Sequence, residues 1–271
     1  MDGKPIGVFD SGVGGLTVAG EIMKQLPDES LLYFGDTARF PYGSRGADEL
    51  KRFAFEIVSF LQCEGVKMVV IACNSASSAA LTLAQAHFDI PILGVIEPGA
   101  RAAVQATRNR RIGVVGTQAT ISSGAYDRAI HTLDAGAKVF SQACPDLADF
   151  VERGVVTGEK ARRIVGRYLE SLISAGVDTL ILGCTHYPLL SEVIGEIMGK
   201  DVRLVSSAEE AAREVREILT CRGHLRKEKS SPTYRFLSTG DESKFLRLGR
   251  RFLGREIKRV EKVSLGTEVA L

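Results

Sequence analysis

The sequence predicts an α/β fold of two similar lobes with mostly parallel sheets, with an active site in the cleft between the lobes. The first observation is that short apolar runs alternate with longer segments of helical period, which favours parallel sheets covered by helices on both faces. The second is that the chain repeats itself. The run that begins at Ile6 recurs at Ile112, 106 residues later, and the run that ends in Cys73 recurs with Cys184, 111 residues later. Two similar offsets favour a duplicated α/β unit over coincidence.

The predicted strands are short apolar runs of the kind that form buried strands. In order, they are Ile6–Phe9, Leu31–Phe34, Met68–Ile71, Ile92–Ile96, Ile112–Val115, Lys138–Phe140, Thr179–Leu182, Val202–Val205 and Tyr234–Leu237. Predicted helices include Asp48–Cys63, Gly158–Ser174, Ala208–Thr220 and one from Asp241. We expect residues 1–97 together with 207–271 to form the first lobe and residues 98–206 to form the second.

Composition restricts the class of protein. The chain has 271 residues, 45% hydrophobic and 25% charged, with a net charge of +2, which gives no argument for a nucleic-acid or membrane partner. No segment approaches the ~20 apolar residues of a membrane span, and the start has no apolar stretch long enough for a signal peptide. We therefore expect a cytoplasmic protein whose five cysteines are reduced. None of them has the C-x-x-C spacing of a zinc or thioredoxin-like site.

The charge is unevenly distributed toward the carboxyl end. Between Arg222 and Lys262 there are 13 Lys or Arg residues against 5 Asp or Glu residues, an excess of eight. A basic stretch can bind polyanions. However, Phe245, Leu248 and Phe252 recur at helical spacing, which favours an amphipathic helix docked on the first lobe with its basic face in solvent. We expect no specific nucleic-acid binding.

The two cysteine-ending runs carry the clearest functional signal. Met68–Ser75 and Thr179–His186 are each an apolar run that ends in a thiol followed by polar residues. A single cysteine after an apolar strand is usually a buried small hydrophobe. A matched pair at the carboxyl ends of two strands, where open α/β sheets bind ligands, instead suggests one reactive group on either side of a substrate carbon. A racemase that works without a cofactor needs this arrangement.

Two glycine-containing turns follow the first and second predicted strands. Asp10–Gly15 is neither a dinucleotide-binding fingerprint, since the third glycine is missing, nor a P-loop, since no Gly-Lys-Ser/Thr follows. Its glycines suit either a tight strand-to-helix turn or an approach of backbone N–H groups to an anion. Asp10 and Ser11 are candidate functional residues. In the second turn, backbone N–H groups near Tyr42 and Gly43 could hold a carboxylate.

Four blocks stand in order along nearly the whole chain: Asp10–Gly15, Pro41–Gly43, Cys73–Ala76 and Cys184–Leu189. Together they resemble the signature blocks of glutamate racemases within the aspartate/glutamate racemase family. The family pattern usually has Thr where this chain has Ser75, which keeps the hydroxyl. The resemblance implies interconversion of L- and D-glutamate without a cofactor or metal, in a homodimer, with D-glutamate supplied to peptidoglycan synthesis.

By this resemblance, Cys73 would act on one enantiomer of glutamate and Cys184 on the other. Asp10 would assist Cys73, His186 would assist Cys184, and Glu152 sits where the family often has a supporting acid. Cysteine suits the role of base because its usual pKa of about 8.5 falls when a cation or a helix N-terminus favours the thiolate. The substrate-binding residues would be Asp10, Ser11, Pro41, Tyr42, Gly43, Asn74, Ser75, Thr185 and His186.

Two other functions stay open from the residues alone. A racemase of aspartate or of another small amino acid would share the twin-cysteine chemistry, because pocket shape decides the length of the substrate side chain. A non-catalytic, two-lobed amino-acid-binding protein would share the fold but has no need of two thiols. No lysine lies in a motif that suggests a Schiff base to pyridoxal phosphate, and no metal-ligand cluster is visible.

Overall fold

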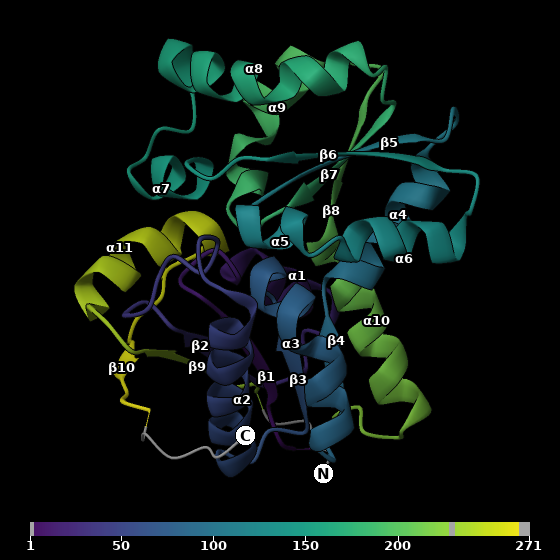
Figure 1. The fold of residues 1–271 in the computed structure, drawn as a ribbon. Helices are drawn as coiled ribbons and strands as arrows, with labels where there is room; N and C mark the ends of the chain where they lie inside the picture. The colour runs from purple at the N-terminus through teal and green to yellow at the C-terminus, as the bar shows by residue number, and fades with distance from the viewer. Residues whose placement is uncertain (1–2, 228–230, 266–271) are drawn as a thin grey trace.

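A computed structural model of the chain describes residues 3–227 and 231–265. In these residues the strands form two sheets, one in each of two lobes (Figure 1). The strands of the first sheet are β1 (Ile6–Asp10), β2 (Leu31–Gly35), β3 (Met68–Ile71), β4 (Ile92–Gly94), β9 (Tyr234–Ser238) and β10 (Glu261–Lys262). Those of the second are β5 (Arg111–Gly116), β6 (Lys138–Ala143), β7 (Thr179–Gly183) and β8 (Arg203–Ser206).

The strand order is β10-β9-β2-β1-β3-β4 in the first sheet and β6-β5-β7-β8 in the second. Neighbouring strands in both sheets run parallel. The predicted α/β class, with two lobes of parallel sheets, is therefore confirmed.

Helices cover both faces of each sheet, as Figure 1 shows. In the first lobe they are α1 (Leu16–Gln25), α2 (Ala47–Cys63), α3 (Asn74–His87), α10 (Ser207–Cys221) and α11 (Glu242–Leu253). In the second they are α4 (Ile96–Ala106), α5 (Gln118–Ser122), α6 (Ala125–Leu133), α7 (Leu147–Glu152), α8 (Gly158–Ser174), the 3₁₀ helix η1 (Tyr187–Leu190) and α9 (Ser191–Met198). Side chains of one strand alternate between the two faces: Ile6 and Val8 pack with α1, whereas Phe9 packs with α2 and α3.

The two lobes are built on the same plan. The order β2-β1-β3-β4 of the first sheet is repeated as β6-β5-β7-β8 in the second. The registers correspond as well, because Ile6 lies opposite Met68 and the equivalent Ile112 lies opposite Thr179. The offsets of 106 and 111 residues found in the sequence therefore relate two strand pairs of the same order and register, as a duplicated unit requires.

The strand predicted at Ile92–Ile96 was too long, and this prediction is wrong at its carboxyl end. β4 ends at Gly94, and α4 begins at Ile96. The Val95 N–H donates to the hydroxyl oxygen of Ser77 over 3.2 Å instead of continuing the sheet. A Cβ at Gly94 would lie 2.6 Å from the same oxygen, so only glycine fits at this close approach to α3. Beyond it the chain continues into α4 of the second lobe.

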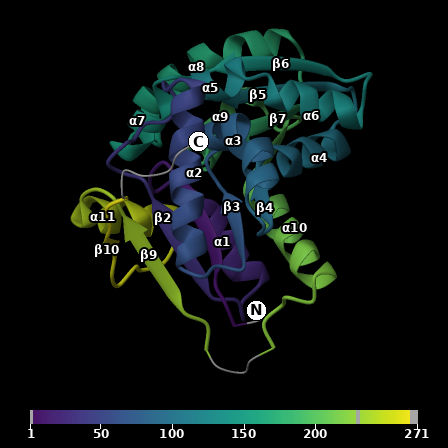
Figure 2. The ribbon, with the colours of Figure 1, turned by 60° about the horizontal axis from the view of Figure 1, so that its bottom comes forward.

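The carboxyl-terminal segment returns to the first sheet. β9 pairs with β2, and β10 lies beside β9 at the sheet edge (Figure 2). Phe245, Leu248 and Phe252 of α11 are buried, and α11 packs against α1, so the predicted docking of this helix on the first lobe is confirmed.

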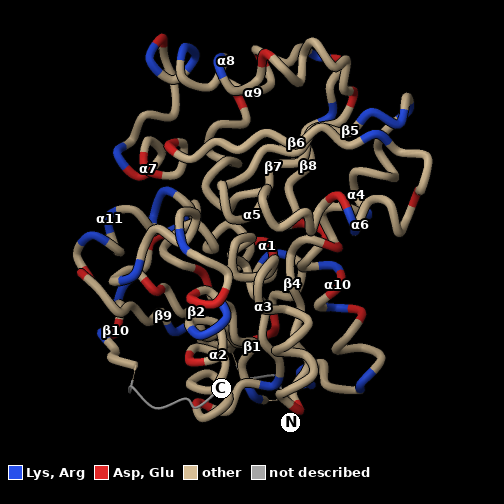
Figure 3. The backbone as a smooth tube through the Cα atoms, viewed as in Figure 1, with Lys and Arg blue, Asp and Glu red and all other residues tan. Residues whose placement is uncertain are grey.

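Basic and acidic residues intersperse over the outer helices and loops (Figure 3). None of the helices in the described ranges has both the length and the apolar character of a membrane span.

Candidate active site

A cavity of about 100 Å³ lies between the lobes at the carboxyl ends of β3 and β7. Both predicted thiols, Cys73 and Cys184, line it, one from each lobe. The other lining residues are Ser11, Phe40, Pro41, Tyr42, Gly43, Ser44, Asn74, Ser75, Thr117, Gln118, Pro145, Ala148, Thr185 and His186. The carboxyl ends of parallel strands are the usual ligand-binding edge of such sheets, so this cavity is the candidate active site.

Cys73 stands between β3 and α3. Its backbone is extended (φ −68°, ψ 117°) and it occupies the N-cap position of α3. Its Sγ lies 3.9 Å from the Ser11 hydroxyl oxygen. Burial, reinforced by the negative charge of Asp10, raises the pKa of Cys73 to about 12. In the unliganded protein Cys73 is therefore a protonated thiol at neutral pH, which is the form of a proton donor.

Cys184 directly follows β7, and its Sγ lies 3.9 Å from Nδ1 of His186. The opposite nitrogen of this imidazole, Nε2, lies 3.5 Å from Oε1 of Glu152, the last residue of α7. The second carboxylate oxygen of Glu152 is 2.8 Å from Nζ of Lys244 in α11. Cysteine, imidazole, carboxylate and ammonium thus form one chain that crosses from the cavity to the surface.

This chain changes the charge state of its members. Burial alone would lower the pKa of His186, but its contacts with Cys184 and Glu152 outweigh burial and raise that pKa to about 10. Burial would likewise raise the pKa of Glu152, but His186 and Lys244 hold it below its usual value. At neutral pH the pair is therefore an imidazolium and a carboxylate.

Asp10, the last residue of β1, is completely buried and lies behind the cavity wall. One carboxylate oxygen accepts a hydrogen bond from the Gly12 N–H over 3.0 Å, and the other accepts one from the Thr185 hydroxyl over 3.2 Å. Burial raises the pKa of Asp10, opposed by the nearby His186. Asp10 and Glu152 are the two predicted site residues that do not line the cavity; Asp10 reaches it through Thr185 and Glu152 reaches it through His186.

Two glycines after Asp10 make room for neighbouring side chains, Gly14 for the second lobe and Gly15 for Asp10 itself. A Cβ at Gly14 would lie 2.4 Å from the Thr185 hydroxyl oxygen and 2.5 Å from Nδ1 of His186. A Cβ at Gly15 would lie 2.5 Å from Cβ of Asp10. These distances are far below van der Waals contact, so the turn contains glycines because the acid–base side chains pack directly on its backbone.

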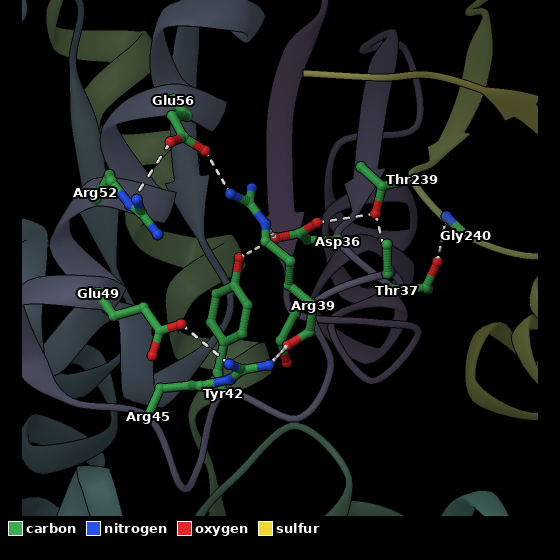
Figure 4. A network of polar contacts seen from close by, with 12 residues as sticks. Asp36, Thr37, Arg39, Tyr42, Arg45, Glu49, Arg52, Glu56, Thr239 and Gly240 are labelled. Atoms are coloured by element: carbon green, nitrogen blue, oxygen red, sulfur yellow. Dashed lines mark hydrogen bonds and ion pairs between the residues drawn. The ribbon is translucent and has the colours of Figure 1, made fainter. Parts of the chain in front are cut away.

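The loop after β2 carries Phe40, Pro41, Tyr42, Gly43 and Ser44 to the cavity. Figure 4 shows the polar network that holds this loop. Its centre is the buried carboxylate of Asp36, which accepts hydrogen bonds from the Tyr42 hydroxyl, from Nε of Arg39 and, over 2.9 Å, from the Thr239 hydroxyl. Because the Tyr42 hydroxyl is bound to Asp36, the groups of this turn that can bind a ligand are the backbone N–H groups around Tyr42 and Gly43.

A group of hydroxyls closes the cavity on the side of the second lobe. The hydroxyls of Ser75 and Thr117 are 2.8 Å apart, and that of Thr117 donates to Thr120 over 3.0 Å. Thr117 was missed as a site residue although the sequence contains a signal for it, because the repeat that equates Ile6 with Ile112 also equates Ser11 with Thr117. Phe40, Ser44, Gln118, Pro145 and Ala148 were also missed, and they carry no comparable signal.

The other cysteines and possible metal ligands are further candidates for site residues. All five cysteines are free, as expected for reduced thiols, and burial raises the pKa of Cys144, outside the cavity lining, to about 12. Within residues 3–227 and 231–265, no group of three or more His, Cys, Asp or Glu side chains is arranged to hold a metal ion.

Comparison with known proteins agrees with this geometry. Residues 16–215 match the family model of Asp/Glu/hydantoin racemases. The chain is 54% identical to the glutamate racemase of Parafrankia sp. (strain EAN1pec) over 261 residues, which cover 96% of this chain and 94% of that protein. Its structure is similar to the crystal structure of glutamate racemase isoform RacE1 from Bacillus anthracis, with a TM-score of 0.94, 47% identity and coverage of 98% and 99% of the two chains.

A second solved structure is that of glutamate racemase from Francisella tularensis in complex with D-glutamate. It has a TM-score of 0.93 and 37% identity to this chain, and the match covers 99% of this chain and all of that one. The chain therefore belongs to the Asp/Glu/hydantoin racemase family, in which these similarities assign it to the glutamate racemases, a class of isomerases.

Proposed function

We propose that this chain interconverts L- and D-glutamate by two-base proton transfer, with Cys73 and Cys184 as the two bases and no cofactor in the reaction. The observation that carries the proposal is that both thiols line one cavity from opposite lobes. Inversion at a carbon requires a proton to leave one face and another to arrive at the opposite face, so a pair of opposed acid–base groups suits this chemistry.

In one direction, the thiolate of one cysteine takes the α-hydrogen as a proton. The electron pair of the broken C–H bond stays on the α-carbon and spreads into the neighbouring carboxylate. The thiol of the other cysteine then donates its proton to the opposite face of that carbon and becomes the thiolate. The substrate leaves with inverted configuration, and the negative charge has moved from one sulfur to the other.

The helper groups favour particular protonation states in this scheme. The raised pKa of Cys73, about 12, keeps this residue as the thiol that can donate. His186 is an imidazolium at neutral pH because its pKa is about 10, and we propose that this cation stabilises a thiolate that forms at Cys184. Asp10 would assist Cys73, and Glu152 would hold the proton on His186.

The substrate would lie among the polar groups of the cavity wall. We propose that Ser11, Asn74, Ser75, Thr185 and the backbone of the Pro41–Gly43 turn bind its carboxylates and ammonium, with Asp10 and His186 close by. We further propose that the binding cleft lies between a first lobe of residues 1–97 and 207–271 and a second of residues 98–206. Residues 1–2, 228–230 and 266–271 of these lobes lie outside the described residues. A cytoplasmic homodimer that supplies D-glutamate to peptidoglycan synthesis stays a prediction.

The experiment that tests this function is incubation with L-glutamate in D2O, with L-aspartate in parallel, followed by circular dichroism and by NMR of the α-position. We expect the optical signal of L-glutamate to decay and that of L-aspartate to persist. In a two-base reaction, early D-glutamate carries deuterium while the remaining L-glutamate keeps its hydrogen. Equal deuteration of both enantiomers from the start would indicate a single base, and selective turnover of L-aspartate would show a different substrate.

A further inference from the structure

The carboxamide of Asn74 has one end bound and one end free. Asn74 follows Cys73 as the first residue of α3, lines the cavity and is 3% exposed. Its Oδ1 accepts a hydrogen bond from the Tyr126 hydroxyl over 2.7 Å. Its Nδ2 is buried and has no hydrogen-bond partner. A buried N–H donor without an acceptor is unfavourable, so an acceptor on a bound molecule is expected at this position.

Tyr126 comes from α6 in the other lobe and occupies a slot made by two glycines. A Cβ at Gly183, directly before Cys184, would lie 3.1 Å from the Tyr126 ring. A Cβ at Gly99 in α4 would lie 3.3 Å from the Tyr126 hydroxyl oxygen. The ring therefore packs on the segment that carries Cys184, while its hydroxyl binds the residue after Cys73. Tyr126 joins the two thiol-bearing segments.

The direction of this hydrogen bond decides how the amide is turned. Burial raises the pKa of Tyr126, so the phenol stays neutral and keeps its proton. An amide oxygen can only accept, so the phenol donates its proton to Oδ1 of Asn74. A carboxamide has an oxygen that accepts and an NH2 group that donates. Because the Tyr126 hydroxyl binds the oxygen of Asn74, the NH2 group of Asn74 points away from Tyr126.

We propose that Tyr126 is a positioning residue of the racemase: by holding Oδ1 of Asn74, it directs Nδ2 toward a carboxylate of the substrate in the cavity. This inference rests on the proposed function, because the acceptor is a carboxylate of glutamate. Tyr126 does not itself line the cavity, so it acts on the substrate only through Asn74.

The test is the variant Tyr126→Phe, which keeps the ring in its slot and removes the hydroxyl. We expect KM for both enantiomers to rise by about tenfold or more, the scale of a lost hydrogen bond to a charged group, with a smaller fall in kcat. D-glutamate affinity measured by calorimetry should fall by a similar factor. The two proposals fail on different measurements. A wild type that does not racemise glutamate by circular dichroism refutes the proposed function, whereas a racemising wild type whose Tyr126→Phe variant keeps the same KM and the same calorimetric affinity refutes the positioning role.

Two further variants distinguish positioning from general loosening. In an Asn74→Ala background, Tyr126→Phe should cause no additional loss of D-glutamate affinity, because the pathway through Asn74 is already absent. The control is Tyr187→Phe, which removes another buried second-lobe hydroxyl, one that donates to the Cys144 carbonyl over 2.9 Å. It should lower Tm to a similar extent and leave the affinity unchanged. Equal affinity losses in Tyr126→Phe and Tyr187→Phe, or an undiminished effect without Asn74, would overturn the proposal.

Discussion

The Thr185 hydroxyl, next to Cys184 in the second lobe, donates a hydrogen bond over 3.2 Å to the carboxylate of Asp10 at the end of β1 in the first lobe. This bond joins the two halves of the site. The resemblance to glutamate racemases assigned Asp10 to Cys73 alone, yet Asp10 also interacts electrostatically with His186. The two acid–base sets therefore share one buried carboxyl group, and the assignment of one helper to each thiol stays a prediction.

Replacement of either cavity thiol should abolish racemisation without unfolding the protein. We expect Cys73→Ala and Cys184→Ala each to lower turnover by ~10²–10⁴-fold, the usual contribution of an acid–base group. Circular dichroism measures both the turnover of L-glutamate and the folded state. Cys144→Ala is the matched control, because it removes a buried thiol that does not line the cavity. More than a few per cent of wild-type turnover in either cavity variant would refute the two-base mechanism.

The helper groups should act in a direction-specific way. Asp10→Asn should mainly slow the direction in which Cys73 takes the proton, and His186→Asn the direction in which Cys184 does. The equilibrium constant between enantiomers is one, so kcat/KM must stay equal in both directions and the asymmetry must appear in kcat and KM separately. The measurement is initial-rate kinetics from each enantiomer. Identical kcat changes in both directions for both variants would contradict the assignment.

The pH profile should respond to Glu152 through His186. The contacts of His186 with Cys184 and Glu152 overcome its burial and raise its pKa to about 10, so activity that needs the imidazolium falls as pH rises toward that value. Glu152→Gln removes a supporting negative charge and lowers this pKa, which should move the alkaline limb of kcat to lower pH. Glu196→Gln, which breaks the exposed Glu196–Arg162 pair, is the control. An alkaline limb that stays in place in Glu152→Gln would show that the His186 proton is not needed.

A buried ion pair far from the cavity should contribute strongly to stability. Nζ of Lys67 lies 2.5 Å from Glu29, with side-chain exposures of 0% and 3%, and it also donates to the His224 carbonyl over 2.9 Å. Lys67→Met leaves Glu29 charged and buried, which should reduce the free energy of unfolding by about 3–5 kcal/mol. Urea titration measures the loss. Lys24→Met, which breaks an exposed pair with Glu21, should cost under ~1 kcal/mol, and equal losses in the two variants would contradict the prediction.

The basic carboxyl-terminal region should not bind DNA strongly. Arg247, Arg250 and Arg251 are exposed on α11, while the apolar face of the helix is buried. The aromatic side chains of α11, Phe245 and Phe252, are buried, so they offer no stacking platform beside these arginines. Weak binding at low salt is common to basic patches. DNA affinity should therefore be measured near physiological salt. Submicromolar binding that disappears when the three arginines become Gln, but persists when Arg162, Arg163 and Arg167 of α8 become Gln, would reveal a second function.

Much of the fold could be predicted because its signals are local. β3 and α8 have the predicted bounds, Met68–Ile71 and Gly158–Ser174, since an uninterrupted apolar run and a helical period are visible in neighbouring residues. The end of β4 was not predictable in this way. It depends on the Ser77 hydroxyl, which meets Val95 only after α3 has folded back over the strand.

By itself, the sequence determined the α/β class, the duplication and the two thiols at equivalent strand ends, because each depends on the pattern of side chains along one stretch of chain. Only the tertiary structure decided which groups meet around those thiols. The contacts of Thr185 with Asp10, of Tyr126 with Asn74 and of Lys244 with Glu152 join residues from different lobes. They form only when the carboxyl ends of the two sheets come together in the folded protein. The spacing of residues along the chain does not show which side chains then meet.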